Sequence, residues 1–335
     1  MTGVGRTPGG HHELPMRTRH AASALLAASA AAATLAACGG SSSKDDAASG
    51  TPASSGGSSE LILAKAATAT EQAKTAAVSI EQRISGAGTP KPITLTATGT
   101  TSLSRPELDL TYDLAPLLRS FGQSAGDGKA RIVVDGSRVD VDPPAVPGLT
   151  IPNGATWVRI DLRAAVQALG LDPDALAATA QFDPASQLKR LQSLKGIRKS
   201  GTTTVDGTEV TKYAGTISAR DALATLPASQ RTKIEQSLEK LGGSASLDQK
   251  SATEIDVDAD GLVRRQVTST TIPSQGGTGG GKIDHTITYS DFGKALDPPT
   301  PSGSEVFDAT SLLKQGLGGL ASGGGAPGVG VTTTP

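Results

Sequence analysis

Hydrophobic and polar residues alternate along many segments of the chain, and this alternation predicts β-strands. The clearest case is 107–114, where Leu108, Leu110, Tyr112 and Leu114 alternate with polar residues. Because successive side chains of a strand point to opposite faces, such a segment has one buried and one solvated face. The same period predicts further strands at 78–84, 93–98, 130–141 (a hairpin), 157–162, 196–205, 208–217, 253–257, 262–271 and 282–289.

Helical spacing or helix-start signals mark other segments. These are 60–74, 162–169, 172–180, 184–194, 218–226 and 228–241. Ser58 or Ser59 is the expected N-cap of the first helix, and Ser218 that of the fifth. Helices therefore stand in blocks between runs of strands, which favours the α+β class.

Asp-Gly pairs link neighbouring strands at 135–136, 206–207 and 260–261. Such short links require antiparallel pairing, because parallel strands need long crossovers. Roughly nine or ten strands joined in this way predict one large, curved antiparallel sheet. Strands with one polar side leave one face of the sheet to solvent, so we expect the helices to cover the other face.

The two ends of the chain differ from this middle. Residues 1–37 contain an extension followed, from Met16, by Arg17, Arg19 and an Ala-rich apolar stretch, which is typical of a signal peptide and makes Met16 the expected start. Residues 38–59 are rich in Gly, Ser and Asp and predict a flexible tether. Residues 60–301 are the expected folded domain, and 302–335 a flexible C-terminal tail.

Cys38 is the only cysteine, and it directly follows the apolar leader in Leu35-Ala36-Ala37-Cys38-Gly39. This motif resembles the lipobox of bacterial lipoproteins. The resemblance implies a diacylglycerol thioether on Cys38, fatty acylation, and anchoring to the outer face of the cell membrane. Two acyl chains anchor stably where one is marginal. The alternative is an ordinary secretory leader in which Cys38 is incidental.

Composition limits the remaining chemistry. The net charge of −1 gives no basic footprint for nucleic acid. One cysteine excludes an intrachain disulfide and a multi-cysteine metal site. No cofactor is expected, and we expect a monomer that is not an enzyme.

Isolated polar motifs each have a structural interpretation. His285 lies at an alternate position with Ile283 and Ile287, so on a strand all three point to the same face. It is expected to face inward as a core residue, without catalytic partners. Asp256 and Asp258 share a parity and are expected on the solvated face; nothing favours a glycosidase pair. The Gly-rich run 276–281 precedes a strand and is expected to be a hairpin tip, not a phosphate loop.

The order of several short phrases resembles the LolA/LppX-like lipoprotein superfamily, closest to the actinobacterial LppX and LprG group. The phrases are WVRID at 157–161, LKGI at 194–197, VDGTEVTKY at 205–213, IDVDADGL at 255–262 and YSDFG at 289–293. The resemblance covers about 60–301. It implies a half-barrel sheet with helices packed on its concave face, and an apolar cavity that holds glycolipid or lipoprotein acyl chains for transport or presentation across the envelope.

The candidate cavity lining is the apolar side of the first strands. It comprises Ile80, Ile93, Leu95, Leu108, Leu110, Tyr112, Ile132, Val134, Val158 and Ile160. The alternative is that these residues only pack on helices, in a non-catalytic surface interaction or structural lipoprotein with a closed core. Aromatic residues are few, at 2%, and the abundant small residues fit either interpretation.

Overall fold

The computed structural model describes residues 56–86, 91–124, 126–145, 150–168, 197–224, 228–229, 231–232, 235, 248–272 and 280–314. All of them belong to the larger of the chain's two units, Ala36–Pro335. Cys38, the leader and the tether up to residue 55 lie outside the described residues, as do the expected helices at 172–180 and 184–194 and most of that at 228–241.

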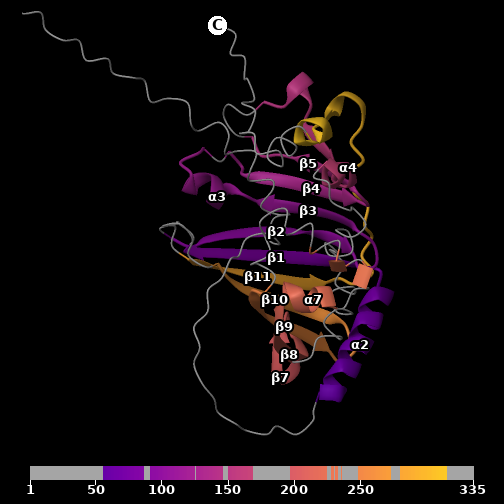
Figure 1. Ribbon diagram of the computed structural model, residues 1–335. Coiled ribbons are helices and arrows are strands. Elements are labelled where there is room, and N and C mark those ends of the chain that lie inside the picture. Colours follow the sequence, from indigo (N-terminus) through magenta and orange to yellow (C-terminus); the bar gives the residue numbers. More distant parts are fainter. Residues whose placement is uncertain are drawn as a thin grey trace, which may run out of the picture. The chain divides into compact units, whose positions relative to one another are not determined.

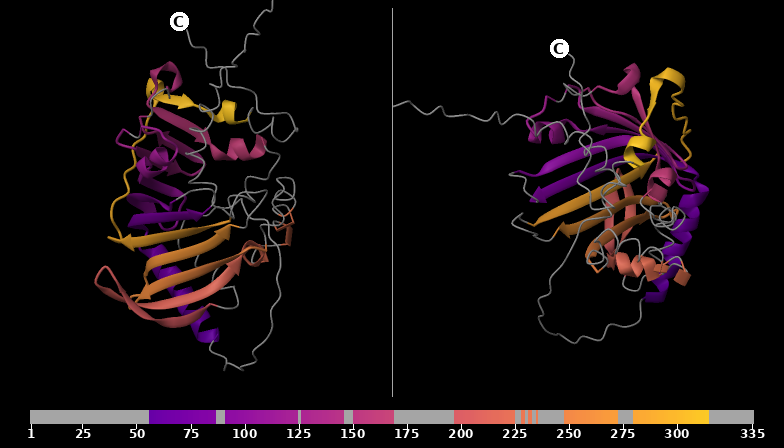
Figure 2. Two further views of the ribbon diagram at one scale, coloured as in Figure 1. Left: turned by 90° about the vertical axis from the view of Figure 1, so that its left-hand side faces the viewer. Right: turned by 45° about the horizontal axis from the view of Figure 1, so that its top comes forward.

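Twelve strands of the described residues form one open, twisted sheet (Figures 1 and 2). Their order across the sheet is β12-β6-β5-β4-β3-β2-β1-β11-β10-β9-β8-β7. In chain order they are β1 (Thr75–Gly86), β2 (Ile93–Ser102), β3 (Glu107–Asp113), β4 (Lys129–Asp135), β5 (Arg138–Asp142), β6 (Trp157–Asp161), β7 (Arg198–Val205), β8 (Thr208–Ser218), β9 (Lys250–Asp258), β10 (Val263–Ile272), β11 (Gly281–Ser290) and β12 (Val306–Asp308).

Every neighbouring pair is antiparallel except β12 and β6, which are parallel. The predicted turn between β7 and β8 shows why the hairpins form. Asp206 and Gly207 both have positive φ angles, of 46° and 80°, as a two-residue type I′ turn requires. The large, mostly antiparallel sheet expected from the alternation is therefore confirmed.

Two elements depart from the expectation. β12 lies within the segment expected to be a flexible tail, and it pairs with β6 through Val306, Phe307 and Asp308. The short helix α3 (Ala115–Ser120) was not predicted, because six residues are too few to show a helical period.

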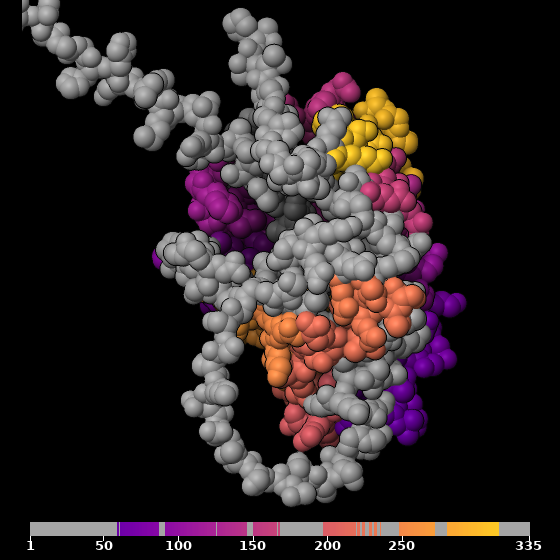
Figure 3. All heavy atoms as spheres, viewed as in Figure 1, coloured from indigo at the N-terminus to yellow at the C-terminus, as the bar shows by residue number. Residues whose placement is uncertain are grey.

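The first helix, α2 (Gly56–Gln72), begins before Ser58 and Ser59, so neither serine is its N-cap. Three of its residues, Leu63, Ala66 and Ala67, are buried in one cluster with Val78, Leu110, Ile255 and Tyr289 of the sheet. The hydroxyl of Thr70 accepts a hydrogen bond of 3.2 Å from the Val263 N–H, which ties α2 to the start of β10. Figures 1 and 3 show α2 in indigo at the margin of the described part.

Two further helices lie against strands of the sheet. α4 (Leu162–Ala168) packs against β6, and α7 (Ala219–Ala224) packs against β8. The wider helical layer that was expected over the concave face would consist mainly of segments outside the described residues, so that part of the expectation stays a prediction.

The strands β2 and β3 approach each other closely at Gly99. A Cβ atom at this position would lie 1.9 Å from the carbonyl oxygen of Asp109 and 2.9 Å from the Cα of Leu110. Only glycine permits this backbone contact, so Gly99 fixes how the first strands pack together.

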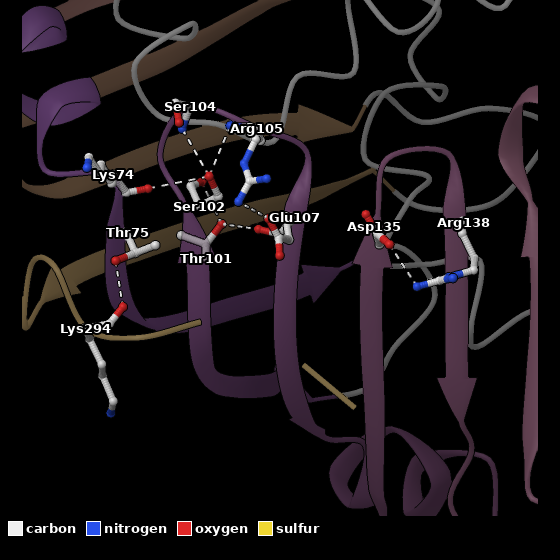
Figure 4. Close-up of polar contacts among 10 residues, drawn as sticks. All are labelled: Lys74, Thr75, Thr101, Ser102, Ser104, Arg105, Glu107, Asp135, Arg138 and Lys294. Carbon is white, nitrogen blue, oxygen red and sulfur yellow. Dashed lines mark hydrogen bonds and ion pairs between the residues drawn. The ribbon is translucent and has the colours of Figure 1, made fainter. Parts of the chain in front are cut away.

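Polar contacts join the strand ends at one rim of the sheet (Figure 4). The Ser102 hydroxyl donates to the Lys74 carbonyl and accepts from the Arg105 N–H at 3.1 Å, which orders the link between β2 and β3. The Thr75 hydroxyl donates to the Lys294 carbonyl at 2.6 Å. We call residues 291–305, which connect β11 to β12, the strap.

Candidate functional site

The pairing register places all ten predicted lining residues on one face of the sheet. Leu110 on β3 pairs with Gly99 on β2 and with Ile132 on β4. Ile132 in turn pairs with Val141 on β5, and Val141 pairs with Val158 on β6. Directly paired residues point to the same face of a sheet. We call this the apolar face, and the opposite side, which carries Asp109, the charged face. On the apolar face lie Ile80, Ile93, Leu95, Leu108, Leu110, Tyr112, Ile132, Val134, Val158 and Ile160.

These ten residues divide into two groups by burial. Five are buried, with exposed fractions of 8% or less: Ile93, Leu95, Leu108, Leu110 and Val134. The other five, Ile80, Tyr112, Ile132, Val158 and Ile160, are half-buried. Burial raises the pKa of the Tyr112 hydroxyl, which stays neutral. The face is therefore part core and part accessible apolar surface.

Polar residues cross the apolar face in one row on β1, β11, β10 and β9. Gln82, His285, Thr268 and Thr253 are direct cross-strand neighbours in one row. We call these four residues the polar row. His285 shares its face with Ile283, Ile287 and Tyr289, so its predicted inward orientation is confirmed. Burial lowers the pKa of the His285 imidazole, which is therefore neutral at pH 7.

Sequence reasoning singled out His285 but missed the rest of the polar row. Gln82 lies between Ile80 and Ile84 on the same face, so its parity was a usable signal. The row itself could not be found in this way, because it depends on β1 pairing with β11, about 200 positions away in the chain.

Ion pairs cross between strands on the charged face. Arg131 binds both carboxylate oxygens of Asp109 at 2.9 and 2.7 Å, and Arg159 binds both oxygens of Asp140 at 2.6 and 2.9 Å. These hydrogen bonds raise the pKa of both guanidinium groups above the usual arginine value. Arg159 Nη2 also donates to the Pro301 carbonyl at 2.9 Å, so the strap passes over this face.

Asp256 and Asp258 lie on the charged face, as their parity predicts, but they are not solvated. Their exposed fractions are 0% and 8%, because Arg265 and Arg264 cover them at 2.7 and 2.5 Å. Burial raises the pKa of the Asp256 carboxyl, and the nearby Arg265 opposes this only in part. The pair is structural in its geometry, with each carboxylate bound to its own arginine.

The described residues form neither an enclosed ligand pocket nor a metal site. A shallow depression of about 320 Å³ runs along α2, lined by Ala64, Lys65, Thr68, Ala69 and Gln72. Among the described residues, no three His, Cys, Asp or Glu side chains gather as a metal site would require. No helix in the described ranges is long and apolar enough to cross a bilayer.

Several solved structures are similar to this chain. The lipoprotein LppX of Mycobacterium tuberculosis aligns with a TM-score of 0.40 and 13% identity over 72% of this chain and 99% of its own. LprF of Mycobacterium bovis aligns at 0.37 and 14% over 76% and 100%, and a LolA superfamily protein of Nitrosomonas europaea at 0.24 and 11% over 72% and 94%. No protein-family model and no curated protein sequence matches the chain.

Proposed function

We propose that this chain is a lipoprotein anchored through Cys38 to the extracytoplasmic face of the cell membrane, and that it binds acyl chains on the apolar face. Its role is non-catalytic: it holds lipid or lipoprotein acyl chains for transport or presentation across the envelope. The observation that carries the proposal is the run of apolar side chains that shares one face from β1 to β6, of which five of the ten lining residues are only half-buried.

The physical basis is the transfer of hydrocarbon from water. Each buried CH₂ group contributes about 0.8 kcal/mol, so a few methylene contacts along one acyl chain give useful affinity without covalent chemistry. Half-buried Ile80, Ile132, Val158 and Ile160 lie on one face of the sheet, on β1, β4 and β6, and offer such contacts. On these strands the opposite face is the charged face, so an acyl chain is expected to bind on the apolar face only.

The anchor is tested by replacing the lipidated cysteine. A Cys38→Ser variant should leave the membrane fraction and lose incorporation of radiolabelled palmitate, because no thiol remains to be alkylated. Fractionation and labelling of the wild type provide the reference. A variant that stays lipid-labelled would disprove the anchor at this position.

Acyl binding is tested with matched valine variants on the two faces. The unacylated Cys38→Ser full chain is purified, and its bound lipid is measured by native mass spectrometry and by displacement of a fluorescent fatty acid. Val158→Asn on the apolar face should weaken fatty-acid binding roughly 10-fold, since it puts an amide against the hydrocarbon. Val267→Asn is the control, because Val267 is also half-buried but lies on the charged face.

The outcomes separate the two functions considered for the chain. Equal losses in both variants would show general destabilisation and contradict a site on the apolar face. A wild-type chain that neither carries nor captures lipid would favour a closed core and a surface interaction lipoprotein instead.

A further inference from the structure

The side of α2 that faces away from the sheet exposes two neighbouring aliphatic side chains near the start of the helix. Leu61 is 58% exposed and Ile62 is 41% exposed. Four large hydrophobic side chains are exposed within the described ranges, and the other two, Phe121 and Leu312, lie far from α2 in the chain. Only on α2 do two of these side chains follow each other, so this is where exposed hydrocarbon is concentrated.

The rest of this outward side carries little charge. Among the side chains of α2 that the structure describes, the exposed ones are Leu61, Ile62, Lys65, Thr68 and Gln72, and only Lys65 is charged. The Thr68 hydroxyl donates to the Ala64 carbonyl at 3.2 Å, so it already has a partner within the helix. A surface helix usually carries charged residues on its solvent side, so this side of α2 is suited to being covered.

The position of α2 in the chain brings it close to the proposed anchor. The helix begins at Gly56, only 18 residues after Cys38. A fully extended link of this length spans at most about 60 Å. For the flexible coil that its composition predicts, the mean span is about 25 Å. Once Cys38 is lipidated, contact between α2 and the bilayer becomes intramolecular, which favours even a small contact surface.

We propose that the outward side of α2 docks on the bilayer that holds the Cys38 lipid, with Leu61 and Ile62 inserted among the acyl chains. The long stem of Lys65 lets its ammonium stay at the level of the phosphates. This proposal rests on the proposed anchor and adds the orientation of the domain on the membrane. Leu63 on the opposite side of α2 stays in the buried cluster, so docking needs no change of fold.

Hydroxyl-radical footprinting read by mass spectrometry tests the docking, because it reports how far water reaches each side chain. The acylated wild type on vesicles of phosphatidylcholine and phosphatidylglycerol is compared with the unacylated Cys38→Ser full chain in solution. On the vesicles, labelling of Leu61 and Ile62 should fall about 5-fold or more, because inserted side chains leave water. Phe121 and Leu312, which are 65% and 52% exposed, are the internal controls and should be labelled equally in both samples.

A matched pair of double variants tests the docking through the exposed Lys65. On the vesicles, a water-soluble acetylating reagent should modify Lys65 about 3-fold faster in Leu61→Ser/Ile62→Ser than in the wild type, because the helix no longer inserts. Phe121→Ser/Leu312→Ser also removes two exposed hydrophobic side chains and should react like the wild type. Equal rates in the two variants would disprove the role of α2.

The outcomes separate the docking from the anchor. If Leu61 and Ile62 are labelled equally on vesicles and in solution, or if all four hydrophobic side chains lose labelling equally, the docking is disproved and the anchor stands. If Leu61 and Ile62 are already protected in solution, the protein itself covers them, and the docking is again disproved. A wild type that does not stay with the vesicles lacks the anchor, so the proposed function and the docking both fail.

Discussion

At the scale of single residues, the charged face is held together by carboxylates that arginines remove from water. Asp140 is fully buried, and its two oxygens are bound by Arg159 at 2.6 and 2.9 Å. Arg138 Nε lies farther away, at 3.4 Å from the same carboxylate. Because an unpaired buried charge is very unfavourable, the interaction between Asp140 and Arg159 makes β5 and β6 depend on each other.

Replacing Arg159 with Met should lower the free energy of unfolding by roughly 3 kcal/mol, since it leaves Asp140 buried without its main partner. Urea denaturation followed by circular dichroism measures this change. Arg105→Met is the matched control: Arg105 pairs with Glu107 but is 72% exposed, and such pairs contribute about 1 kcal/mol or less. Equal losses in the two variants would contradict the importance of burial.

The alternation along β9 predicted which face of the sheet Asp256 and Asp258 occupy, but not how deeply the two side chains are buried. Asp256 and Asp258 lie on the predicted face, yet both are buried beneath Arg265 and Arg264. Alternation reports orientation only. Burial on the charged face depends on long arginine side chains reaching across from the neighbouring strand, which a single strand's pattern does not contain.

At the scale of elements, α7 shows a helix start that the sequence predicted correctly. Ser218 precedes the helix, its hydroxyl accepts from the Asp221 N–H at 3.1 Å, and the Asp221 carboxylate accepts from the Ser218 N–H at 3.0 Å and hydroxyl at 2.6 Å. These hydrogen bonds from Ser218 lower the pKa of the Asp221 carboxyl. This reciprocal arrangement is a capping box.

The carboxylate half of the capping box should stabilise the fold fully only while Asp221 is ionised. Because the folded-state pKa is lowered, its contribution is present above the unfolded value of about 3.9 and is lost as pH falls through the folded value. Asp221→Ala should therefore reduce the urea midpoint at pH 7, and the difference from wild type should shrink at pH 3. Ser218→Ala should cost about 1 kcal/mol at pH 7. A pH-independent difference for Asp221→Ala would contradict the assigned role of the carboxylate.

Helix prediction was less successful where local signals are weak. α3 follows β3 directly and spans only Ala115–Ser120, with a proline in its first turn. A Leu-rich segment of this length has no distinguishable period, and its formation depends on packing: Ala115 and Leu118 are buried together in a small cluster of their own. Its sequence therefore gave no sign of the helix in advance.

At the scale of the whole sheet, the strap and β12 protect one edge. β12 pairs with β6 in parallel, and Pro301 of the strap is buried and accepts the hydrogen bond from Arg159. An uncovered strand edge invites pairing with a second chain. The C-terminal region thus pairs with the edge of β6 and binds the arginine that in turn binds Asp140.

Ending the chain after Asp297 should destabilise the sheet and cause self-association, because the edge of β6 loses its pairing with β12 and Arg159 loses its hydrogen bond to Pro301. Size-exclusion chromatography with light scattering and urea denaturation measure the two effects. A chain ended after Lys314 keeps β12 and should match the full chain in both. If the chain ended after Asp297 stays monomeric, or if only the chain ended after Lys314 self-associates, the role given to β12 is contradicted.

Local patterns in the sequence specify much of this protein: the positions of β1 to β11, the face to which their side chains point, the Asp-Gly hairpins and the cap of α7. These follow from the two-residue period of a strand and from turn and cap chemistry, which act over a few residues. Three features emerge only from the folded chain: β1 lies between β2 and β11, β12 pairs with the edge of β6, and Gln82, His285, Thr268 and Thr253 form one row. The reason is that register between distant strands is set by the fit of whole faces, and no local pattern encodes it.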